Sequence, residues 1–389
     1  MSKSQGNIVL AGSLAQKPHR GGHTWQFLQY LLGLRRLGWN VLFVDRLEPD
    51  MCLDEHGRPC PVERSVSLSY FSEVMSRFGL SDAYSLIYNH GEKVFGQPRS
   101  RVLEHTKHSA LLLNVMGFLD DEEILGCAPR RVFLDTDPGF DQMWQALGLA
   151  NLLDGYDDHV TIAENIGEPG CAIPTCGLNW IRWRQPVVLE EWSPDDRRHD
   201  GSFTTIASWR GPYGPIEYEG KTYGLKVHEF RKFVGLPALT GESFEIALNI
   251  HAAEAQDLEL LKRNRWQLAD PEVAAADPWV YRDYIGRSKA EFMAAKGIYV
   301  DTWSGWFSER SICYLATGKP VVAQDTGLAP HYPIGEGLLT FSTIEEAAAA
   351  VEEVSGNYDH HAAAARELAV EYFDSDKVLG QLLSALGVA

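Results

Sequence analysis

The sequence lacks any apolar stretch long enough to cross a membrane. Its longest apolar run, residues 110–119, is interrupted by Asn114 and Gly117 and falls well short of the roughly 20 residues that a membrane-spanning helix needs. The apolar segment at residues 8–11 is too short for the core of an export signal, and no cleavage pattern follows it. We therefore expect a soluble, cytoplasmic protein without a membrane span.

Cysteines are few, and none of them forms a Cys-x-x-Cys pair. The chain has six cysteines, of which Cys171 and Cys176 are the closest two. Zinc knuckles and thioredoxin-like redox sites both need such pairs, so neither is expected. Reduced loop cysteines are the favoured interpretation, and no metal site is predicted.

Positive charge is in deficit. The chain has 35 Lys and Arg against 53 Asp and Glu, which gives a formal net charge of -18. A nucleic-acid backbone and an anionic membrane surface would both repel such a protein, so neither is expected as a partner. Local clusters of Arg and Lys remain compatible with a bound diphosphate.

Strand-like and helix-like segments alternate along the 389 residues, a length that suits two domains. In the first part, strands are predicted at residues 7–12, 41–44, 110–115, 131–134 and 160–162, with a helix at 24–37. In the second part, strands are predicted at residues 203–207, 244–248, 297–300 and 320–323, with a helix at 226–234. This alternation predicts an α/β protein with parallel, doubly wound sheets.

The regular pattern breaks down between the two parts. Residues 174–194 are rich in Pro, Gly, Trp and Arg, and the charged run 195–201 follows. We therefore predict an N-terminal domain at residues 1–188 and a C-terminal domain at 189–364.

The loop after the first strand has no dinucleotide-binding fingerprint. Asp45 ends the second strand, as the ribose-binding acid does in NAD-dependent enzymes. However, residues 12–16 lack Gly-x-Gly-x-x-Gly, and the pair Gly21-Gly22 comes roughly nine residues too late for a tight dinucleotide turn. A dehydrogenase is therefore disfavoured, and Asp45 is interpreted as a cleft-edge residue beside Arg46 or a strand terminator.

Residues 303–327 are the most informative stretch. Ser304 and Gly305 form a turn before an amphipathic helix, and a short strand at 320–323 then runs into a polar loop. A helix N-terminus preceded by small residues presents unpaired N–H groups and a partial positive charge. These features suit the diphosphate of a nucleotide.

The order of this helix, the Ala-x-Gly-x-Pro-Val-Val strand and the Asp-x-Gly loop resembles the donor-binding segment of GT-B glycosyltransferases. It is loosely similar to their group 1 and bacterial spore-maturation branches. Gly21-Gly22-His23 is similar to the loop that borders the cleft in this family. The resemblance implies two Rossmann-like domains facing a cleft, with the acceptor in the N-terminal and a nucleotide sugar in the C-terminal domain. It also implies that a last helix, residues 365–389, packs back on the N-terminal domain.

On the acceptor side, the resemblance gives roles to the first loop. Gly21 and Gly22 would let the backbone approach a ligand closely. His23 would deprotonate the acceptor hydroxyl, as a His does in some inverting members. A helix-capping role for His23 is an equal alternative, and His19 is a weaker competitor as the base.

Asp137 follows the strand at residues 131–134, at an edge where doubly wound sheets bind ligands. We predict that it contacts the acceptor or partners His23, while a turn role before Pro138 stays open. Asp135 and Asp137 form an Asp-x-Asp pair like the metal site of the other large glycosyltransferase fold. That fold is a single domain, so metal binding is disfavoured.

On the donor side, Arg210 and Lys226 occupy places where the family neutralises the leaving diphosphate, with Lys221 as a substitute for Lys226. The other predicted donor contacts are Ser304, Gly305, Trp306, Ser308, Glu309, Arg310, Asp325, Thr326 and Gly327. Retaining members carry a pair of glutamates near this segment, but Cys313 and Gly305 stand at the corresponding positions. The stereochemistry of transfer therefore stays open.

The resemblance implies a metal-independent, hexosyltransferase-type enzyme that needs no cofactor. Its substrates would be a nucleotide-diphosphate sugar and a small-molecule acceptor. A GT-B nucleotide-sugar epimerase and a non-catalytic sugar-nucleotide binder are the alternatives. The excess of Arg over Lys and the abundant Ala suggest a bacterial source and a natural-product or envelope-glycan pathway.

Overall fold

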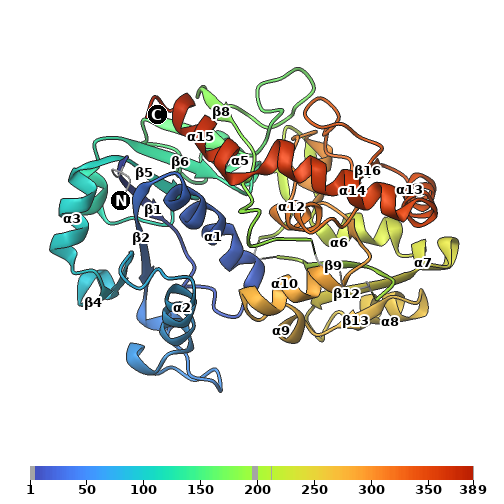
Figure 1. Cartoon of the computed structure of the whole chain (residues 1–389), viewed down its shortest axis with the longest axis horizontal. Helices are drawn as coiled ribbons and strands as arrows, with labels where there is room; N and C mark the ends of the chain where they lie inside the picture. Colours follow the sequence, from blue (N-terminus) through green and yellow to red (C-terminus); the bar gives the residue numbers. More distant parts are fainter. Residues whose placement is uncertain (1–4, 195–199, 212, 389) are drawn as a thin grey trace.

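The computed structural model describes residues 5–194, 200–211 and 213–388. The described chain forms two α/β halves that lie side by side in Figure 1, the first coloured blue to green and the second yellow to orange. The first half is built on an eight-stranded sheet and the second on a six-stranded sheet. Of the charged run predicted at the junction, residues 195–199 lie outside the described residues.

The first sheet has the strand order β4-β3-β2-β1-β5-β6-β7-β8, and its neighbouring strands are parallel except for β3 and β4. The strands are β1 (Gly6–Ala11), β2 (Trp39–Leu47), β3 (Tyr84–Tyr88), β4 (Lys93–Gly96), β5 (Ser109–Val115), β6 (Arg131–Asp135), β7 (Asp158–Thr161) and β8 (Trp180–Arg182). The direction of winding reverses between β1 and β5. Loops at the carboxyl ends of these two strands therefore face a crevice in which ligands bind in doubly wound sheets.

Helices cover both faces of this sheet, which explains why residues 8–11 of β1 are all apolar. The helices of this half are α1 (Gly21–Arg36), α2 (Val66–Arg77), α3 (Arg99–Lys107), α4 (Glu122–Cys127) and α5 (Phe140–Ala146). Leu10 on one face of β1 belongs to the same core cluster as Leu28 of α1. Val9 on the other face packs in a second cluster with Val102 of α3 and Ile124 of α4. Successive strand residues point to opposite faces, so a strand covered on both sides has no polar alternation.

The second sheet has the order β13-β12-β9-β14-β15-β16 and is parallel throughout, with its switch point between β9 and β14. Its strands are β9 (Ser202–Ser208), β12 (Ser243–Asn249), β13 (Gln267–Ala269), β14 (Ala290–Met293), β15 (Val321–Gln324) and β16 (Leu338–Phe341). A hairpin of β10 (Ile216–Tyr218) and β11 (Lys221–Tyr223) follows β9. The helices are α6 (Lys226–Phe230), α7 (Leu236–Thr240), α8 (Ala255–Arg263), α9 (Pro271–Ala274), α10 (Pro278–Arg287), α11 (Gly297–Asp301), α12 (Glu309–Ala316) and α13 (Ile344–Gly356). The prediction of a doubly wound α/β fold is confirmed in both halves.

One predicted strand is wrong. Residues 297–300 lie in the short helix α11, and the strand of this region is β14, immediately before it. A short apolar run does not distinguish a buried strand from a buried helix, so the sequence pattern there was ambiguous.

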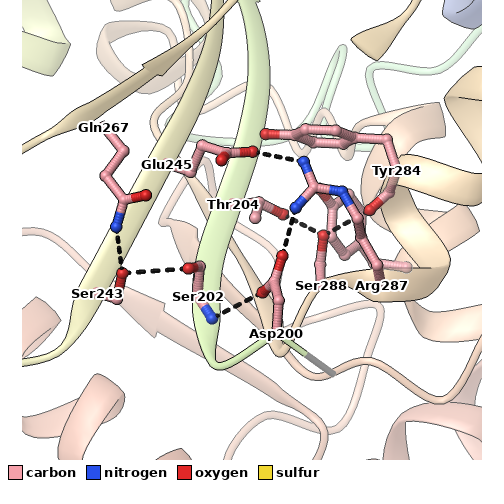
Figure 2. A network of polar contacts seen from close by, with 10 residues as sticks. Asp200, Ser202, Thr204, Ser243, Glu245, Gln267, Tyr284, Arg287 and Ser288 are labelled. Carbon is pink, nitrogen blue, oxygen red and sulfur yellow. Dashed lines mark hydrogen bonds and ion pairs between the residues drawn. The ribbon is translucent and has the colours of Figure 1, made fainter. Parts of the chain in front are cut away.

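A polar network fixes the amino-terminal end of the second sheet, as Figure 2 shows. Arg287 of α10 pairs with Asp200, just before β9, and with Glu245 of β12, whose Oε1 lies 2.7 Å from Nη2. Ser202 and Ser243, the first residues of β9 and β12, are joined by their hydroxyls at 3.1 Å. The network lies at the end of the sheet opposite the carboxyl edge where a ligand would bind.

The end of the chain lies against the first half. After α14 (Tyr358–Leu368) and a π-helical segment, α15 (Ser375–Ala385) packs on α1, and Figure 1 shows it in red crossing toward β8. Arg36 of α1 donates two hydrogen bonds to Asp376, each 3.0 Å long. A Cβ on Gly33 would lie 2.5 Å from Leu379, so the two helices approach closely at a glycine. The domain limits proposed above stay a prediction. Within the described ranges, no helix combines the length and apolar character needed to cross a membrane.

Candidate active site

Two adjacent cavities lie where the switch points of the two halves face each other. The larger has a volume of about 800 Å³ and the smaller about 300 Å³. Lys17, His23, Glu309 and Arg310 line both cavities. These residues come from the loop after β1, from the first turn of α1 and from the start of α12. The candidate site is therefore built by both halves.

His23 is held as a neutral imidazole at the boundary of the two cavities. Its Nε2 lies 3.0 Å from the carbonyl oxygen of Ser13 and 3.2 Å from the Ser13 hydroxyl. A carbonyl oxygen can only accept, so Nε2 carries the hydrogen and Nδ1 holds the lone pair. Burial, and then the charge of Lys17, lower the pKa of His23 to about 3. The imidazole is therefore uncharged at neutral pH, and Nδ1 carries no proton. The competitor His19 packs against Tyr70 and is not among the residues that line either cavity.

Asp45 shapes the loop between β1 and α1, the helix that carries His23. Its carboxylate accepts hydrogen bonds from the backbone N–H groups of Ala15 at 2.7 Å and Arg46 at 2.6 Å. Burial raises the pKa of Asp45 to about 7. Asp45 lines neither cavity in the described chain. Its role is to stabilise the loop after β1 from the carboxyl end of β2.

Gly21 and Gly22 let α1 approach the second half. The N–H group of Gly21 donates to the carbonyl oxygen of Ala275 at 2.7 Å, and a Cβ on Gly21 would lie 2.3 Å from the backbone oxygen of Asp277. A Cβ on Gly22 would lie 3.0 Å from the ring of Tyr281. Both glycines line the larger cavity, and their small size keeps the two halves close there.

The two carboxylates of the Asp-x-Asp pair have separate partners. Asp135 accepts from Gln142 at 2.6 Å and from Thr161 at 2.7 Å, and burial raises its pKa to about 6. Asp137 lies in the smaller cavity, where Lys296 Nζ is 2.7 and 2.6 Å from its two oxygens. The hydroxyl of Tyr299 also donates to Asp137. The partners found for Asp137 therefore come from the second half rather than from His23. Among the described residues, no group of three or more His, Cys, Asp or Glu side chains could hold a metal ion.

Four cationic side chains line the smaller cavity: Lys17, Lys226, Lys296 and Arg310. Lys226 opens α6 and donates a hydrogen bond to the carbonyl oxygen of Ala294. Burial, followed by the charges of Arg310 and Lys296, lowers the pKa of Lys226 to about 7. This concentration of positive charge suits a polyanionic ligand, because a bound diphosphate would relieve the mutual repulsion.

Arg310 has one hydrogen-bonding nitrogen to spare. Its Nε donates to Glu291 at 2.5 Å and its Nη1 to the carbonyl oxygen of Ile206 at 2.7 Å. Nη2 is buried and has no hydrogen-bond partner within the part of the chain that the structure describes. The side chain is only 9 % exposed and lines both cavities. The guanidinium is thus fixed by two partners, while its third nitrogen has none among the described residues.

The start of α12 was predicted correctly as a helix N-terminus. The hydroxyl of Ser308 caps the helix by accepting from the N–H group of Arg310 at 3.2 Å. Ser308 and Glu309 line the smaller cavity, and burial raises the pKa of Glu309. Trp306 also lines that cavity and stacks on Tyr299, with ring centroids 4.1 Å apart.

Arg210 lies at the rim of the larger cavity. It is exposed and pairs with both oxygens of Glu254, with Nη2 3.0 Å from Oε2. The substitute cation Lys221 pairs with Asp301 at 3.2 Å and is not among the residues lining the two cavities.

The remaining predicted donor contacts cluster elsewhere: Ser304, Gly305, Asp325, Thr326 and Gly327 are not among the residues lining the two cavities. Ser304 and Gly327 meet Asn165 of the first half, whose backbone N–H donates to the carbonyl oxygen of Ser304 at 3.0 Å and whose side chain donates to that of Gly327 at 3.1 Å. Asp325 caps the turn by accepting from the N–H group of Gly327 at 2.8 Å. Their roles as donor contacts stay predictions.

Sequence reasoning missed Lys17, Asp141, Lys296 and Tyr299, all of which line the smaller cavity. Lys296 follows β14 at the carboxyl edge of the sheet, so a correct assignment of β14 would have drawn attention to it. Asp141 carried no comparable signal, because its burial depends on the packing of α5 against the second half.

No protein-family model matches the chain, and no curated protein matches it. Solved structures do match. An alpha-glucosyltransferase in complex with UDP is 12 % identical, covers 98 % of this chain and 100 % of its own, and superposes with a TM-score of 0.59. Anabaena HepE in complex with UDP-glucose is 11 % identical over 99 % and 100 %, with a TM-score of 0.58. Sucrose-phosphate synthase from Thermosynechococcus elongatus is 13 % identical over 98 % of each chain, with a TM-score of 0.55.

These structures are GT-B glycosyltransferases, and the likeness spans nearly the whole chain. The protein therefore has the GT-B fold, and the predicted fold class is confirmed. At 11 to 13 % identity the likeness concerns the fold.

One expectation is corrected by the same findings. We excluded nucleic acid as a partner because of the net negative charge. An alpha-glucosyltransferase of this fold is found in complex with UDP and a 13-mer DNA, at a TM-score of 0.60 to this chain. The exclusion of nucleic acid is therefore wrong. A net charge summed over the whole chain does not describe the local surface at which a protein of this fold meets DNA.

Proposed function

We propose that this protein is a glycosyltransferase that takes a sugar from a nucleotide-diphosphate donor. The observation that carries the proposal is the unpartnered, buried Nη2 of Arg310, which lies beside Lys226 and Lys296 at the start of α12. A fixed guanidinium and two ammonium groups at a helix N-terminus match the charge of a diphosphate. UDP and UDP-glucose complexes among the structures of the same fold add support.

The diphosphate would occupy the junction of the two cavities. There Arg310 and Lys226 would stabilise the negative charge that develops on the leaving nucleotide as the sugar–oxygen bond breaks. The larger cavity, at the carboxyl end of β9, would hold the nucleoside. Since side chains of this chain supply the positive charge, the proposed transfer needs no metal ion.

The acceptor would enter from the first half. His23 has its Nδ1 lone pair free and would take the proton of the attacking hydroxyl in an inverting reaction. A hexose is the proposed transferred sugar. The resemblance favours it, and structures of this fold are found with UDP-glucose or with UDP and glucose.

The test is a thermal-shift screen of nucleoside diphosphates and their sugars, followed by calorimetric titration with the best nucleotide. A ligand that binds the native state raises the midpoint temperature of thermal unfolding by mass action. Arg310→Lys should lower the affinity for that nucleotide by about tenfold or more. A lysine cannot hydrogen-bond Glu291 and the carbonyl oxygen of Ile206 and also reach a phosphate. The matched control Arg282→Lys changes a guanidinium that pairs with Glu191 outside both cavities, and it should bind as the wild type does.

Three outcomes would contradict the proposal. Failure of every nucleoside diphosphate to bind would remove the donor site. A new isomer of the donor sugar formed without acceptor would favour an epimerase. Tight binding without transfer or hydrolysis across a broad acceptor panel would leave a sugar-nucleotide-binding protein.

A further inference from the structure

Asp141 is a buried carboxyl group with an oxygen to spare. It lies in the first turn of α5 and lines the smaller cavity, although its side chain is only 4 % exposed. Its Oδ2 has no hydrogen-bond partner among the described residues. Buried polar atoms of native proteins are nearly always paired, so an unpaired one at a cavity wall points to a missing ligand group.

The surroundings of Asp141 keep it uncharged. Burial raises the pKa of Asp141 to about 8, and the charges of Asp135 and Asp137 add to the effect. Those two acids have partners of their own, Gln142 and Thr161 for Asp135 and Lys296 for Asp137. At neutral pH Asp141 is therefore mainly a carboxylic acid, which can both donate and accept a hydrogen bond.

An aromatic surface stands next to this carboxyl group. Phe140 and Trp144 of α5 meet Tyr213 from the loop after β9, with ring centroids 5.6 and 4.9 Å from that of Tyr213. Phe140 and Tyr213 line the smaller cavity, and Tyr213 is 47 % exposed. Exposed aromatic faces beside a polar group are suited to a ligand with an apolar ring face.

We propose that the smaller cavity is an acceptor subsite in which Asp141 hydrogen-bonds a neutral hydroxyl of the acceptor while Tyr213 packs on an apolar or aromatic ring of the same molecule. This inference rests on the proposed function and names its acceptor class, a compact hydroxylated ring compound with an apolar group. The volume of about 300 Å³ is at the lower end for ligand pockets and limits the buried part to a small group.

The charges around the cavity oppose an amine in this place. Lys17, Lys226, Lys296 and Arg310 all line it, whereas Asp137 is already paired with Lys296. An ammonium group would meet Lys17, Arg310 and a partly protonated Lys226, and it would find an uncharged Asp141. A hydroxyl avoids this repulsion and satisfies the free oxygen of Asp141.

The test uses three probes in the presence of saturating UDP. The first is p-nitrophenyl β-D-glucopyranoside, which has hydroxyls and an aromatic ring. Its 2-amino-2-deoxy analogue carries an ammonium group, and methyl β-D-glucopyranoside lacks the aromatic ring. Affinities are measured by calorimetry and ligand-observed NMR for the wild type, Asp141→Asn, Asp141→Leu and Tyr213→Ala. Asp82→Asn is the control, since Asp82 is an exposed carboxylate outside both cavities.

The aromatic glucoside should bind the wild type at least about fivefold better than the methyl glucoside and about tenfold better than the amino analogue. Asp141→Asn, which keeps a neutral hydrogen-bonding group, should stay within about threefold of the wild type, whereas Asp141→Leu should lose about tenfold or more. Tyr213→Ala should remove the advantage of the aromatic ring. UDP affinity should be unchanged in all four variants, which also shows that they fold.

Equal binding of the glucoside by Asp141→Leu and the wild type would overturn the inference, and so would a preference for the amino analogue. No detectable binding of the glucoside to a wild type that binds UDP would overturn the acceptor class while leaving the donor site intact. Failure of UDP and all other nucleoside diphosphates to bind would instead count against the proposed function. If Asp141→Leu does not fold, the wild-type preference for the hydroxyl over the ammonium probe and the loss of the aromatic advantage in Tyr213→Ala still decide the question.

Discussion

The carboxylate of Asp137, which lies just after β6, is bound by the ammonium group of Lys296, which precedes α11 in the other half of the protein. Lys296 Nζ lies 2.7 and 2.6 Å from the two oxygens. Both side chains line the smaller cavity and are partly buried. The pair links the two halves. In it, Asp137 binds the ammonium group of Lys296, which a bound diphosphate would also attract.

Removing the positive charge of this pair should lower nucleotide affinity, and removing its negative charge should raise it. Lys296→Met removes a positive charge from the cavity and should lower the affinity for UDP about tenfold. Asp137→Asn removes the competing carboxylate, so UDP should bind about threefold more tightly. Calorimetry with UDP measures both values. The exposed pair Lys93–Glu63 supplies the control, and Lys93→Met should leave UDP affinity unaltered. Weaker UDP binding by Asp137→Asn would show that Lys296 acts only in holding the halves together.

UDP binding should take up a proton because of Lys226. The pKa of Lys226 is lowered to about 7, so at pH 8 this amine is mostly neutral in the free protein. A nearby diphosphate favours the ammonium form, and binding should therefore draw about half to nine-tenths of a proton from solution at pH 8. UDP affinity should accordingly fall as the pH rises from about 7 to about 9. Calorimetry in buffers of different ionisation enthalpy measures the uptake. Lys226→Arg stays charged throughout and should abolish it; uptake that persists in this variant would assign the proton to another group.

His23→Ala should separate chemistry from donor binding. Since Nδ1 holds the lone pair and burial lowers the pKa of His23 to about 3, the imidazole is uncharged at every pH above about 4, and its lone pair is not taken up by a bound proton. Loss of a general base typically costs about 100-fold or more in rate, whereas UDP affinity should change by less than about twofold. The wild-type rate should show no loss between about pH 8 and pH 5 that depends on His23. The exposed His56→Ala is the control. Full turnover of His23→Ala would leave this residue with a packing role, since no side chain caps α1 in the described chain.

Much of the fold could be predicted because strands such as β1 are buried on both faces. Ile8, Val9 and Leu10 are all fully buried, so the run of apolar residues is continuous and easily recognised. The same holds for the start of α12, where Ser308 is a typical N-cap. β14 was missed, because Glu291 interrupts its four residues and is buried only through its pairing with Arg310.

The site was harder to predict because its groups are defined by contacts across the two halves. Arg310 was expected to meet the donor, but its fixed orientation depends on Glu291 and on the backbone of Ile206. Asp137 was placed in the site, whereas its partner Lys296 is 159 residues away in the sequence. Pairings of this kind leave no periodic pattern, since they are formed only when the two sheets come together.

Asp141 should make the stability of the protein depend on pH. Its pKa is raised from 3.8 to about 8 by burial, so the folded state binds a proton that the unfolded state has already released between these values. The contribution of Asp141 to stability is therefore full below about pH 4 and is lost as the pH rises toward about 8. Asp141→Asn removes this dependence. The difference between the melting temperatures of the variant and the wild type should be larger at pH 8.5 than at pH 5.5, by about 3 °C or more. A constant difference across this range would show that Asp141 titrates normally.

Gly327→Ala should show what the loop after β15 does. Gly327 has a φ of +93°, and a Cβ there would lie 2.4 Å from Asn165 Nδ2 and 2.8 Å from the ring of Trp303. Gly335 has a similar φ of +117° with nothing within 4 Å, so Gly335→Ala measures the backbone strain alone. We expect Gly327→Ala to cost at least about 1 kcal/mol more than Gly335→Ala in urea unfolding, because it also breaks the contact with Asn165. UDP affinity measured on the folded variants separates the two roles of this loop. Unchanged affinity assigns Asp325, Thr326 and Gly327 to the junction of the halves, whereas a loss of tenfold with little destabilisation would support the predicted donor contact.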